Sequence, residues 1–447
     1  MGLPSLLSAA VFATMFACLA APAPAVTPDP GPVHDFTIIA GNAFFDRAPA
    51  LGSVCRFDFG DPAGAYNVLT GYNAAHIYQT PGTYTLKIFR AGLLDGAKTI
   101  HVLPNNRGLL TLTPRDNLFA VVRNLANNTT VLLPSGTTWD LPGQIEIKAR
   151  NIEFRPAGPG PAPRIRRTAA KGSSSVIVTG MDVVFRGIEF DSDKDMAEQG
   201  NNNKVNYRGI SLDGAHVVCV GCTFRNLDDD LFCTPLTRGL LAQWCKFTDE
   251  TRSCDFWLDG TDVTVLGCTM ATSQREHNMR SASPLFYNLL LHDSDLTATH
   301  GKETLTFRGG QDCYASCNRF HTGWVRTGPG PHSDHRPFTA DELRKAFARH
   351  IVFDRNAFVD GSFLGVNEGT FDITAKYNRF DIDHQSVAVH VQGPSVKDFI
   401  LEENYRVLTE GPSPKPIMRV YDEQESEIIE RGNSFKTKEE AEALKGK

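Results

Sequence analysis

The chain has 447 residues, which is enough for two domains, and its 41% apolar and 21% charged residues are typical of a folded globular protein. Its formal net charge of −6 excludes a surface that is basic all over, so we predict no nucleic-acid partner. A local basic groove for an acidic ligand is compatible with that charge.

The N-terminus has the pattern of a secretory signal peptide. Residues 1–25 contain no charged side chain, and an apolar run from Leu6 to Ala21 is followed by Ala23-Pro24-Ala25. We expect cleavage after Ala25 and a mature chain that is secreted, periplasmic or at the cell surface. A lipoprotein cleavage site at Cys18 is a weaker alternative, because the usual leucine is missing. No other stretch could span a bilayer, and we expect a monomer.

Residues 26–34 are proline-rich and predict a linker, and residues 35–104 predict a small β-sandwich because short β-prone runs alternate with turn residues. This region contains Phe57-Asp58-Phe59-Gly60-Asp61, His76-Ile77-Tyr78 and Pro81-Gly82-Thr83-Tyr84. These segments closely resemble the PKD-type immunoglobulin-like module. The resemblance implies a spacer or a binding accessory to an extracellular partner domain. We expect Asp58 and Asp61 to form hydrogen bonds at the turn rather than to bind a metal.

Residues 105–143 predict a cap at the entrance of the next domain. Residues 116–127 can form an amphipathic helix whose apolar face carries Leu118, Val121, Val122 and Leu125. A strand over Thr130–Leu133 follows. A repetitive β domain needs such a cap, because its terminal coil otherwise exposes apolar core and an open sheet edge.

A repeat then dominates the chain. Large apolar residues recur at positions 224, 247, 270, 296 and 320, in steps of 23, 23, 26 and 24. Each repeat holds roughly three short strands, and strands wound as a coil pair with their equivalents about 4.8 Å away. We therefore predict an all-β chain in which residues 105–435 form a single-stranded parallel β-helix. Its helix-then-strand opening is similar to that of the right-handed, pectin-lyase-like superfamily.

One column of small polar residues lies two positions before the large apolar ones. It comprises Cys222, Cys245, Cys268, Ser294, Asn318, Asn356 and Asn378. Stacked asparagines can form hydrogen bonds along the axis, and stacked cysteines can fill an apolar slot. We favour this packing role over disulfides or a metal site, because stacked side chains run parallel and do not cross as a disulfide requires. Nine cysteines remain after residue 25, so at least one thiol has no partner within the monomer.

Three intervals exceed one coil, namely Pro156–Ser175, Asp191–Arg208 and His321–Arg349, and we expect these loops to wall a groove. Residues 436–447 predict a charged tail with a helix. His332-Ser333-Asp334-His335 and Asp191-Ser192-Asp193-Lys194-Asp195 are weak cation motifs, because neither brings a complete ligand set. We assign no metal site, although bound Ca²⁺ is compatible with the sequence.

The repeat also predicts which polar side chains meet on the surface. Residues at matching distances beyond the large apolar positions should form adjacent columns on one face, with His277 and His300 nearby. The expected members are Asp230, Asp255, Trp257, Glu276, Arg280 and Lys302, and we add Arg308 as a binding residue. Acids, bases and a tryptophan in one groove suit a long carbohydrate, because an indole can stack on a sugar ring and an arginine can pair with a uronate carboxylate.

Our leading hypothesis is a polysaccharide lyase that acts by β-elimination. The reaction needs a base for the proton next to the carboxylate and a cation that neutralises that carboxylate. Lys302 could be the base, with its pKa lowered by neighbouring Arg280, and Glu276 and His300 complete the catalytic candidates. Arg280 and Lys302 are 22 residues apart. This spacing is similar to that of the Lys and Arg in chondroitinase B and related alginate lyases, although the order here is reversed.

Two alternatives stay open. Asp228-Asp229-Asp230 and Thr299-His300-Gly301-Lys302 are similar to segments of polygalacturonases, which use aspartate pairs to hydrolyse glycosidic bonds. The third hypothesis is a surface protein that binds glycans or partners along the groove without cleaving them. Under any of these hypotheses the expected ligand is a polysaccharide.

Overall fold

The computed structural model describes residues 34–168, 174–192, 207–249, 254–273, 277–281, 283, 286–299, 302–328, 348–382, 386–392, 396–408, 415–421 and 427–444, with only the backbone at 272 and 273. Several predicted features therefore lie outside the described residues. These are the signal peptide, the His332–His335 motif, the part of the Asp191–Asp195 motif after residue 192, Glu276 and His300. Within the described part, no helix is long and apolar enough to cross a membrane.

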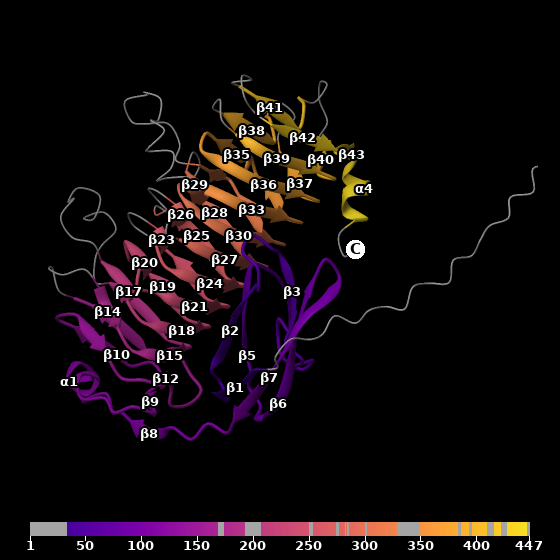
Figure 1. Cartoon of the computed structure of the whole chain (residues 1–447). Coiled ribbons are helices and arrows are strands. Elements are labelled where there is room, and N and C mark those ends of the chain that lie inside the picture. Colours follow the sequence, from indigo (N-terminus) through magenta and orange to yellow (C-terminus); the bar gives the residue numbers. More distant parts are fainter. Residues whose placement is uncertain are drawn as a thin grey trace, which may run out of the picture.

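Three long parallel sheets wind into a solenoid, which is the main body in Figure 1. The thirteen-stranded sheet comprises β8 (Gly108–Thr111), β9 (Thr129–Leu133), β12 (Ile152–Pro156), β15 (Met181–Arg186), β18 (Ala215–Val220), β21 (Arg238–Gln243), β24 (Thr261–Leu266), β27 (Tyr287–His292), β30 (Gly310–Ser316), β33 (Ala348–Asp354), β36 (Thr370–Lys376), β39 (Lys397–Glu402) and β42 (Ile428–Arg431).

The twelve-stranded sheet comprises β10 (Thr138–Leu141), β13 (Arg164–Arg167), β16 (Glu189–Ser192), β19 (Thr223–Arg225), β22 (Lys246–Thr248), β25 (Thr269–Ser273), β28 (Asp295–Ala298), β31 (Arg319–His321), β34 (Ala357–Val359), β37 (Arg379–Asp381), β40 (Tyr405–Val407) and β43 (Ser434–Lys436). The eleven-stranded sheet comprises β11 (Ile145–Ile147), β14 (Ser174–Val178), β17 (Arg208–Leu212), β20 (Asp229–Cys233), β23 (Cys254–Leu258), β26 (His277–Ser281), β29 (Glu303–Phe307), β32 (Trp324–Thr327), β35 (Leu364–Asn367), β38 (Val389–Gln392) and β41 (Met418–Val420).

The register confirms the predicted coil. Phe224 pairs with Phe247, and Phe247 pairs with Met270, so positions one repeat apart are neighbours. The rings of Phe190, Phe224 and Phe247 stack inside the solenoid with centroids 5.0 Å apart at each step. All three rings are fully buried, and each fully buried phenylalanine side chain contributes about 2 kcal/mol of apolar burial. The chain is therefore a parallel β-helix.

The cysteine and asparagine column packs as predicted. Cys222, Cys245 and Cys268 are buried free thiols that donate to backbone carbonyls and also contact one another along the column. Further along the axis, Asn318 donates to the side-chain oxygen of Asn356 at 3.0 Å. The ladder continues with distances of 2.9–3.1 Å through Asn378, Asn404 and Asn433. Each rung satisfies buried amides that would otherwise destabilise the core.

Within the described residues, two helices are present, one at each end of the solenoid (Figure 1). Helix α1 (Leu118–Arg123) is shorter than predicted, because Asn117 caps its start and Asn124 ends it. Leu118 and Val122 are buried against the first coils, so the apolar face closes the core as expected. At the other end, α4 (Lys438–Glu442) begins with a capping box at Thr437.

The N-terminal unit has two sheets. Its five-stranded sheet has the order β1 (His34–Ile39), β7 (Leu93–Leu103), β6 (Gly82–Arg90), β3 (Cys55–Asp58), β4 (Val68–Gly71), and β2 (Ala43–Arg47) pairs with β5 (Asn73–Ile77). Asp58 accepts from the Gly60 amide at 3.2 Å, and Asp61 lies 3.0 Å from His76 Nε2. Both aspartates therefore form the hydrogen bonds that the sequence predicts, whereas the PKD-type assignment stays a prediction.

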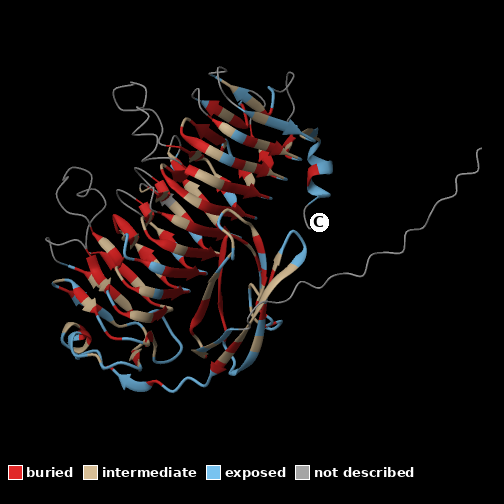
Figure 2. Cartoon of the chain, viewed as in Figure 1, coloured by how far each residue is buried: buried red, intermediate tan, exposed pale blue. Residues whose placement is uncertain are grey.

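This unit covers the outer face of the thirteen-stranded sheet. One apolar cluster joins residues of both parts, including Tyr72 from the unit and Leu241, Leu266 and Leu290 from the sheet. Asn73 donates to the Val263 carbonyl at 3.1 Å. Figure 2 shows buried residues on both sides of this contact. The outer faces of the eleven- and twelve-stranded sheets are left as the two places where a ligand groove can form.

Candidate functional site

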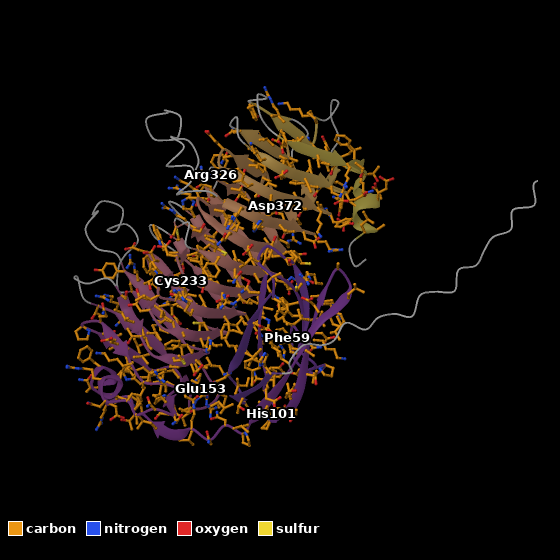
Figure 3. All side chains as sticks on the ribbon, viewed as in Figure 1. Phe59, His101, Glu153, Cys233, Arg326 and Asp372 are labelled. Carbon is orange, nitrogen blue, oxygen red and sulfur yellow. The ribbon has the colours of Figure 1, made fainter. Side chains whose placement is uncertain are left out.

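One row of side chains crosses the eleven-stranded sheet. Phe232, Trp257, Arg280, Thr306 and Arg326 are paired in successive coils. The predicted neighbours Trp257 and Arg280 are adjacent, and the row also contains Phe232, Thr306 and Arg326. Arg326 lies well away from the N-terminal unit, whose core contains Phe59 (Figure 3).

Other predicted columns are wrong because the turns before this sheet differ in length. Strand β20 begins five positions after Phe224, whereas β23 begins seven positions after Phe247. Strand β32 begins only four positions after Phe320. These differences carry Arg326 into the row of Trp257 and Arg280 rather than the row of Lys302.

The expected contact between Lys302 and Arg280 is not formed. Arg280 pairs with Thr306, and Lys302 precedes Glu303, which pairs with His277. Lys302 is thus four positions from the residue that faces Arg280, or about 13 Å along the strand. Lys302 borders the His277 end of the site instead.

Asp230 and Asp255 are not surface residues. Both are fully buried, and Asp255 accepts a hydrogen bond from Asn278 Nδ2 at 2.8 Å. Burial raises the pKa of Asp255 to about 7, although the contacts with Asn278 and Asp230 oppose the shift. Along their strands both residues alternate with the core residues Leu231 and Phe256, so they lie on the same outer face as Trp257, although neither side chain is exposed.

An ion-paired cluster of His277, Glu303 and Arg326 lies beside the row, next to Lys302. His277 Nδ1 is 2.7 Å from one carboxylate oxygen of Glu303, and Arg326 Nη1 is 3.0 Å from the other. Thr306 Oγ1 is 3.4 Å from the same His277 nitrogen. His277 and Glu303 are buried, with 2% and 8% of their surface exposed, so the pair is held in a fixed orientation.

The electrostatics of the cluster give its members distinct protonation states. Burial lowers the pKa of His277, and the adjacent Glu303 carboxylate only partly opposes this shift. Burial also raises the pKa of Glu303, but the hydrogen bond from His277 and the charges of Arg326 and Arg308 outweigh it and hold the pKa below its ordinary value. At neutral pH we therefore expect an ionised carboxylate beside a neutral imidazole.

Three arginines act electrostatically on this pair, and Arg326 contacts it directly. Arg280 and Arg308 both act electrostatically on His277, and Arg308 and Arg326 act on Glu303. The backbone amide of Arg308 is fixed by the Ser281 carbonyl at 3.1 Å. The sequence selected Arg280, Arg308 and His277 but missed Glu303 and the placement of Arg326. Only the position of Glu303 one coil from His277 could have indicated it.

Aromatic rings and guanidinium groups alternate along the start of the row. Arg208 Cζ lies 3.5 Å from the ring centroid of Phe232, and the rings of Phe232 and Trp257 stack at 5.7 Å. Arg280 Cζ then lies 4.7 Å from the Trp257 ring, and Asp259 accepts from Trp257 Nε1 at 2.8 Å. Each cation–π contact contributes about 0.5–2 kcal/mol, so the stack is preformed.

The same pattern continues toward the last coils. Trp324 packs against Phe363 at 5.2 Å, and Phe363 packs against His390 at 4.6 Å. His390 Nδ1 is 2.9 Å from the hydroxyl of Tyr421, whose ring lies 4.6 Å from Arg419 Cζ. We call the whole series the aromatic–arginine face; it comprises Arg208, Phe232, Trp257, Arg280, Trp324, Arg326, Phe363, His390, Arg419 and Tyr421. It extends about 40 Å along the axis.

Metal binding finds no support in the described part of the chain. There, no group of three or more histidine, cysteine, aspartate or glutamate side chains could hold an ion. Because the His332–His335 motif and most of the Asp191–Asp195 motif lie outside the described residues, the Ca²⁺ prediction is untested.

The sequence matches no protein-family model and no curated protein. Solved β-helix structures do resemble it. The exopolygalacturonase of Yersinia enterocolitica has a TM-score of 0.49 and 7% identity, over 87% of this chain and 97% of that one. The Streptococcus pneumoniae surface adhesin PfbA has a TM-score of 0.45 and 12% identity, over 71% of this chain and 94% of that one. The mannuronan C-5 epimerase AlgE6 A-module of Azotobacter vinelandii has a TM-score of 0.42 and 12% identity, over 69% of this chain and 90% of that one. At such low similarity none of these proteins assigns a reaction to this chain.

Proposed function

We propose that the protein binds an acidic polysaccharide along the aromatic–arginine face and cleaves it by β-elimination. The observation that carries the proposal is the convergence of Arg280, Arg308 and Arg326 on the buried His277–Glu303 pair. Guanidinium groups suit carboxylates because of their planar, charge-assisted hydrogen bonds. The rings of Trp257 and its neighbours supply flat apolar surfaces for sugar rings.

The geometry favours His277 as the base. Its lowered pKa keeps the imidazole neutral at pH 7, and the Glu303 carboxylate at Nδ1 stabilises the imidazolium that forms when a proton is taken up. In the proposed reaction the base removes the proton next to the uronate carboxylate, and the arginines stabilise the charge that develops there. The bond to the leaving sugar oxygen then breaks, which leaves a carbon–carbon double bond on one product and a hydroxyl on the other.

The catalytic candidates from the sequence stay part of the proposal. Lys302 borders Glu303 and is the alternative base, and Arg280 keeps its role toward the carboxylate. Glu276 and His300 remain candidates on sequence grounds alone.

The test is incubation of the purified protein with alginate, pectate and glycosaminoglycans while the ultraviolet absorbance of unsaturated uronates is followed. We expect absorbance to rise with at least one polymer, and to rise about 100-fold more slowly with His277→Asn. If Lys302→Ala is inactive and His277→Asn is not, Lys302 is the base. No absorbance change with any polymer would refute elimination.

Hydrolysis is the second candidate, and the Asp230–Asp255 contact favours it. A carboxyl with a pKa near 7 is protonated often enough to act as a general acid at neutral pH. Both carboxyls are buried, as is His277, and both lie on the outer face of the sheet beside Trp257. New reducing ends without ultraviolet absorbance, lost in Asp255→Asn, would support this candidate. Retention on immobilised polymer without any product would leave a glycan-binding protein.

We also propose that this activity takes place outside the cytoplasm, on the strength of the signal-peptide pattern in residues 1–25. The N-terminal unit, which we propose to be a PKD-type module, would then serve as a rigid accessory. Its contact with the thirteen-stranded sheet directs the polymer to the other faces.

A further inference from the structure

A second cleft opens on a different sheet, near the C-terminal end of the solenoid. It has a volume of about 730 Å³ and lies between the outer face of the twelve-stranded sheet and helix α4. Strands β31, β34, β37, β40 and β43 each contribute to its lining. This volume is within the range of ordinary small-ligand sites.

Arg379 forms the floor of this cleft and is 91% buried, since 9% of its surface is exposed. Its Nη2 donates to Asp381 at 2.9 Å and to Glu442 of α4 at 3.2 Å. Within the described residues, Nε and Nη1 have no hydrogen-bond partner of good geometry, although Tyr405 of the cleft wall interacts with the guanidinium. A buried guanidinium with two donor nitrogens so little used is an unusual feature for a purely structural residue, because buried donors are nearly always satisfied.

The walls add charge and aromatic surface. Arg355 Cζ lies 5.0 Å from the ring of Tyr377, and Lys436 Nζ lies 5.8 Å from the ring of Tyr405. Tyr377 is 43% exposed, so one face of its ring can receive a ligand. The complete set of charged lining residues comprises the cations Arg319, Arg355, Arg379, Lys436 and Lys438 and the acids Asp381, Glu403 and Glu442. The excess of cations favours an anion.

The carboxylate of Glu442 pairs with the Arg379 guanidinium, and a carboxylate on a ligand could replace it there. Its side chain is 44% exposed, whereas that of Arg379 is 11% exposed, so the glutamate enters from the solvent side. Helix α4, which carries Glu442, is five residues long. A carboxylate on a ligand would make the same charge-assisted contact.

We propose that this cleft is a second binding site, in which the carboxylate of an acidic oligosaccharide displaces Glu442 from Arg379 while a sugar ring packs on Tyr377. The site is separate from the aromatic–arginine face, because it lies on another sheet. The protein would thus hold an acidic polymer at two points. Two tethered contacts raise the apparent affinity for a long chain well above that of either one.

Calorimetric titration of the full-length protein with trigalacturonate and with trimannuronate tests the site, with maltotriose as the neutral control. We expect two sites per chain for at least one uronate trisaccharide and none for maltotriose. Arg379→Gln should weaken one site at least about tenfold and leave the other, because a charge-assisted hydrogen bond is lost. Glu442→Gln should tighten the same site about threefold or more, because the competing carboxylate is gone.

Arg280→Gln is the matched variant on the aromatic–arginine face and should affect only the other site. A single site that is lost in Arg280→Gln and unchanged in Arg379→Gln would overturn the second cleft and leave the proposed function intact. The reverse result would support the cleft and count against the aromatic–arginine face. Because Arg379→Gln could disturb folding, the opposite shift in Glu442→Gln is the decisive measurement; an unchanged or weaker affinity there refutes the displacement.

Discussion

Replacing Glu303 by glutamine tests the physical basis of the proposed site. The two carboxylate oxygens of Glu303 lie 2.7 Å from His277 and 3.0 Å from Arg326, and the residue is 8% exposed. Glutamine keeps the size and removes the charge, so Arg326 loses its buried counterion. Breaking one side of a buried ion pair costs about 3–5 kcal/mol, and we expect about 3 kcal/mol here because glutamine still accepts a hydrogen bond.

This loss of stability should depend on pH. The folded-state pKa of Glu303 lies below its ordinary value of 4.5, so its charge stabilises the fold above that pH. The contribution disappears as the pH falls through the lower, folded-state pKa. The difference in unfolding free energy between wild type and Glu303→Gln should therefore be full at pH 7 and shrink steadily below about pH 4.5.

The same substitution should slow cleavage about 100-fold or more, because His277 loses the group that orients it and stabilises its protonated form. Glu303 also raises the pKa of His277, so its removal should shift the acid limb of the pH–rate profile to lower pH. Rates come from product absorbance and stability from urea unfolding. Glu146→Gln, on the same sheet and 40% exposed at its side chain, is the control and should change stability by less than about 0.5 kcal/mol. Wild-type activity and stability in Glu303→Gln would refute the reasoning.

Three further predictions concern the asparagine column, the aromatic–arginine face and the buried Asp255. Asn356→Ala should cost about 2–4 kcal/mol in urea unfolding, because buried ladder partners lose their hydrogen bonds, whereas partly exposed Asn433→Ala should cost less. Trp257→Ala should weaken polysaccharide binding about tenfold in affinity electrophoresis, whereas the control Trp244→Ala should bind like wild type. Equal binding by Trp257→Ala and wild type would argue against the aromatic–arginine face. Asp255, with a pKa raised from 3.8 to about 7, should make stability fall as pH rises between these values, and a melting temperature that is equally pH-dependent in Asp255→Asn would contradict this.

Local sequence was sufficient to predict the coil because the residues that repeat in it are large, apolar and inward-facing. Phe224, Phe247 and Met270 can be buried only by stacking on one another, so their spacing fixes the register of the core. The cysteine and asparagine column follows from the same constraint. The helix at the entrance was also predictable, since its apolar residues repeat at helical intervals and must cover an open end.

The outward residues are less constrained, because turns can lengthen without disturbing the core. Two positions of difference between the turns before β20 and β23 were enough to place Asp230 beside Asp255, next to Phe232 and Trp257 on the outer face of the sheet. A similar difference placed Arg326 in the row of Arg280. Spacing along the chain therefore cannot give the members of a surface site, even where it gives the fold.

The sequence by itself determined the architecture: a β-rich N-terminal unit followed by a capped parallel β-helix, because apolar periodicity leaves few ways to bury those side chains. Only the tertiary structure decided which polar residues meet. Turn lengths set the pairing of Glu303 with His277 and Arg326, and the docking of the N-terminal unit on the thirteen-stranded sheet determined which faces stay accessible. Both depend on contacts between residues that are distant in sequence and whose identities carry no periodic signal.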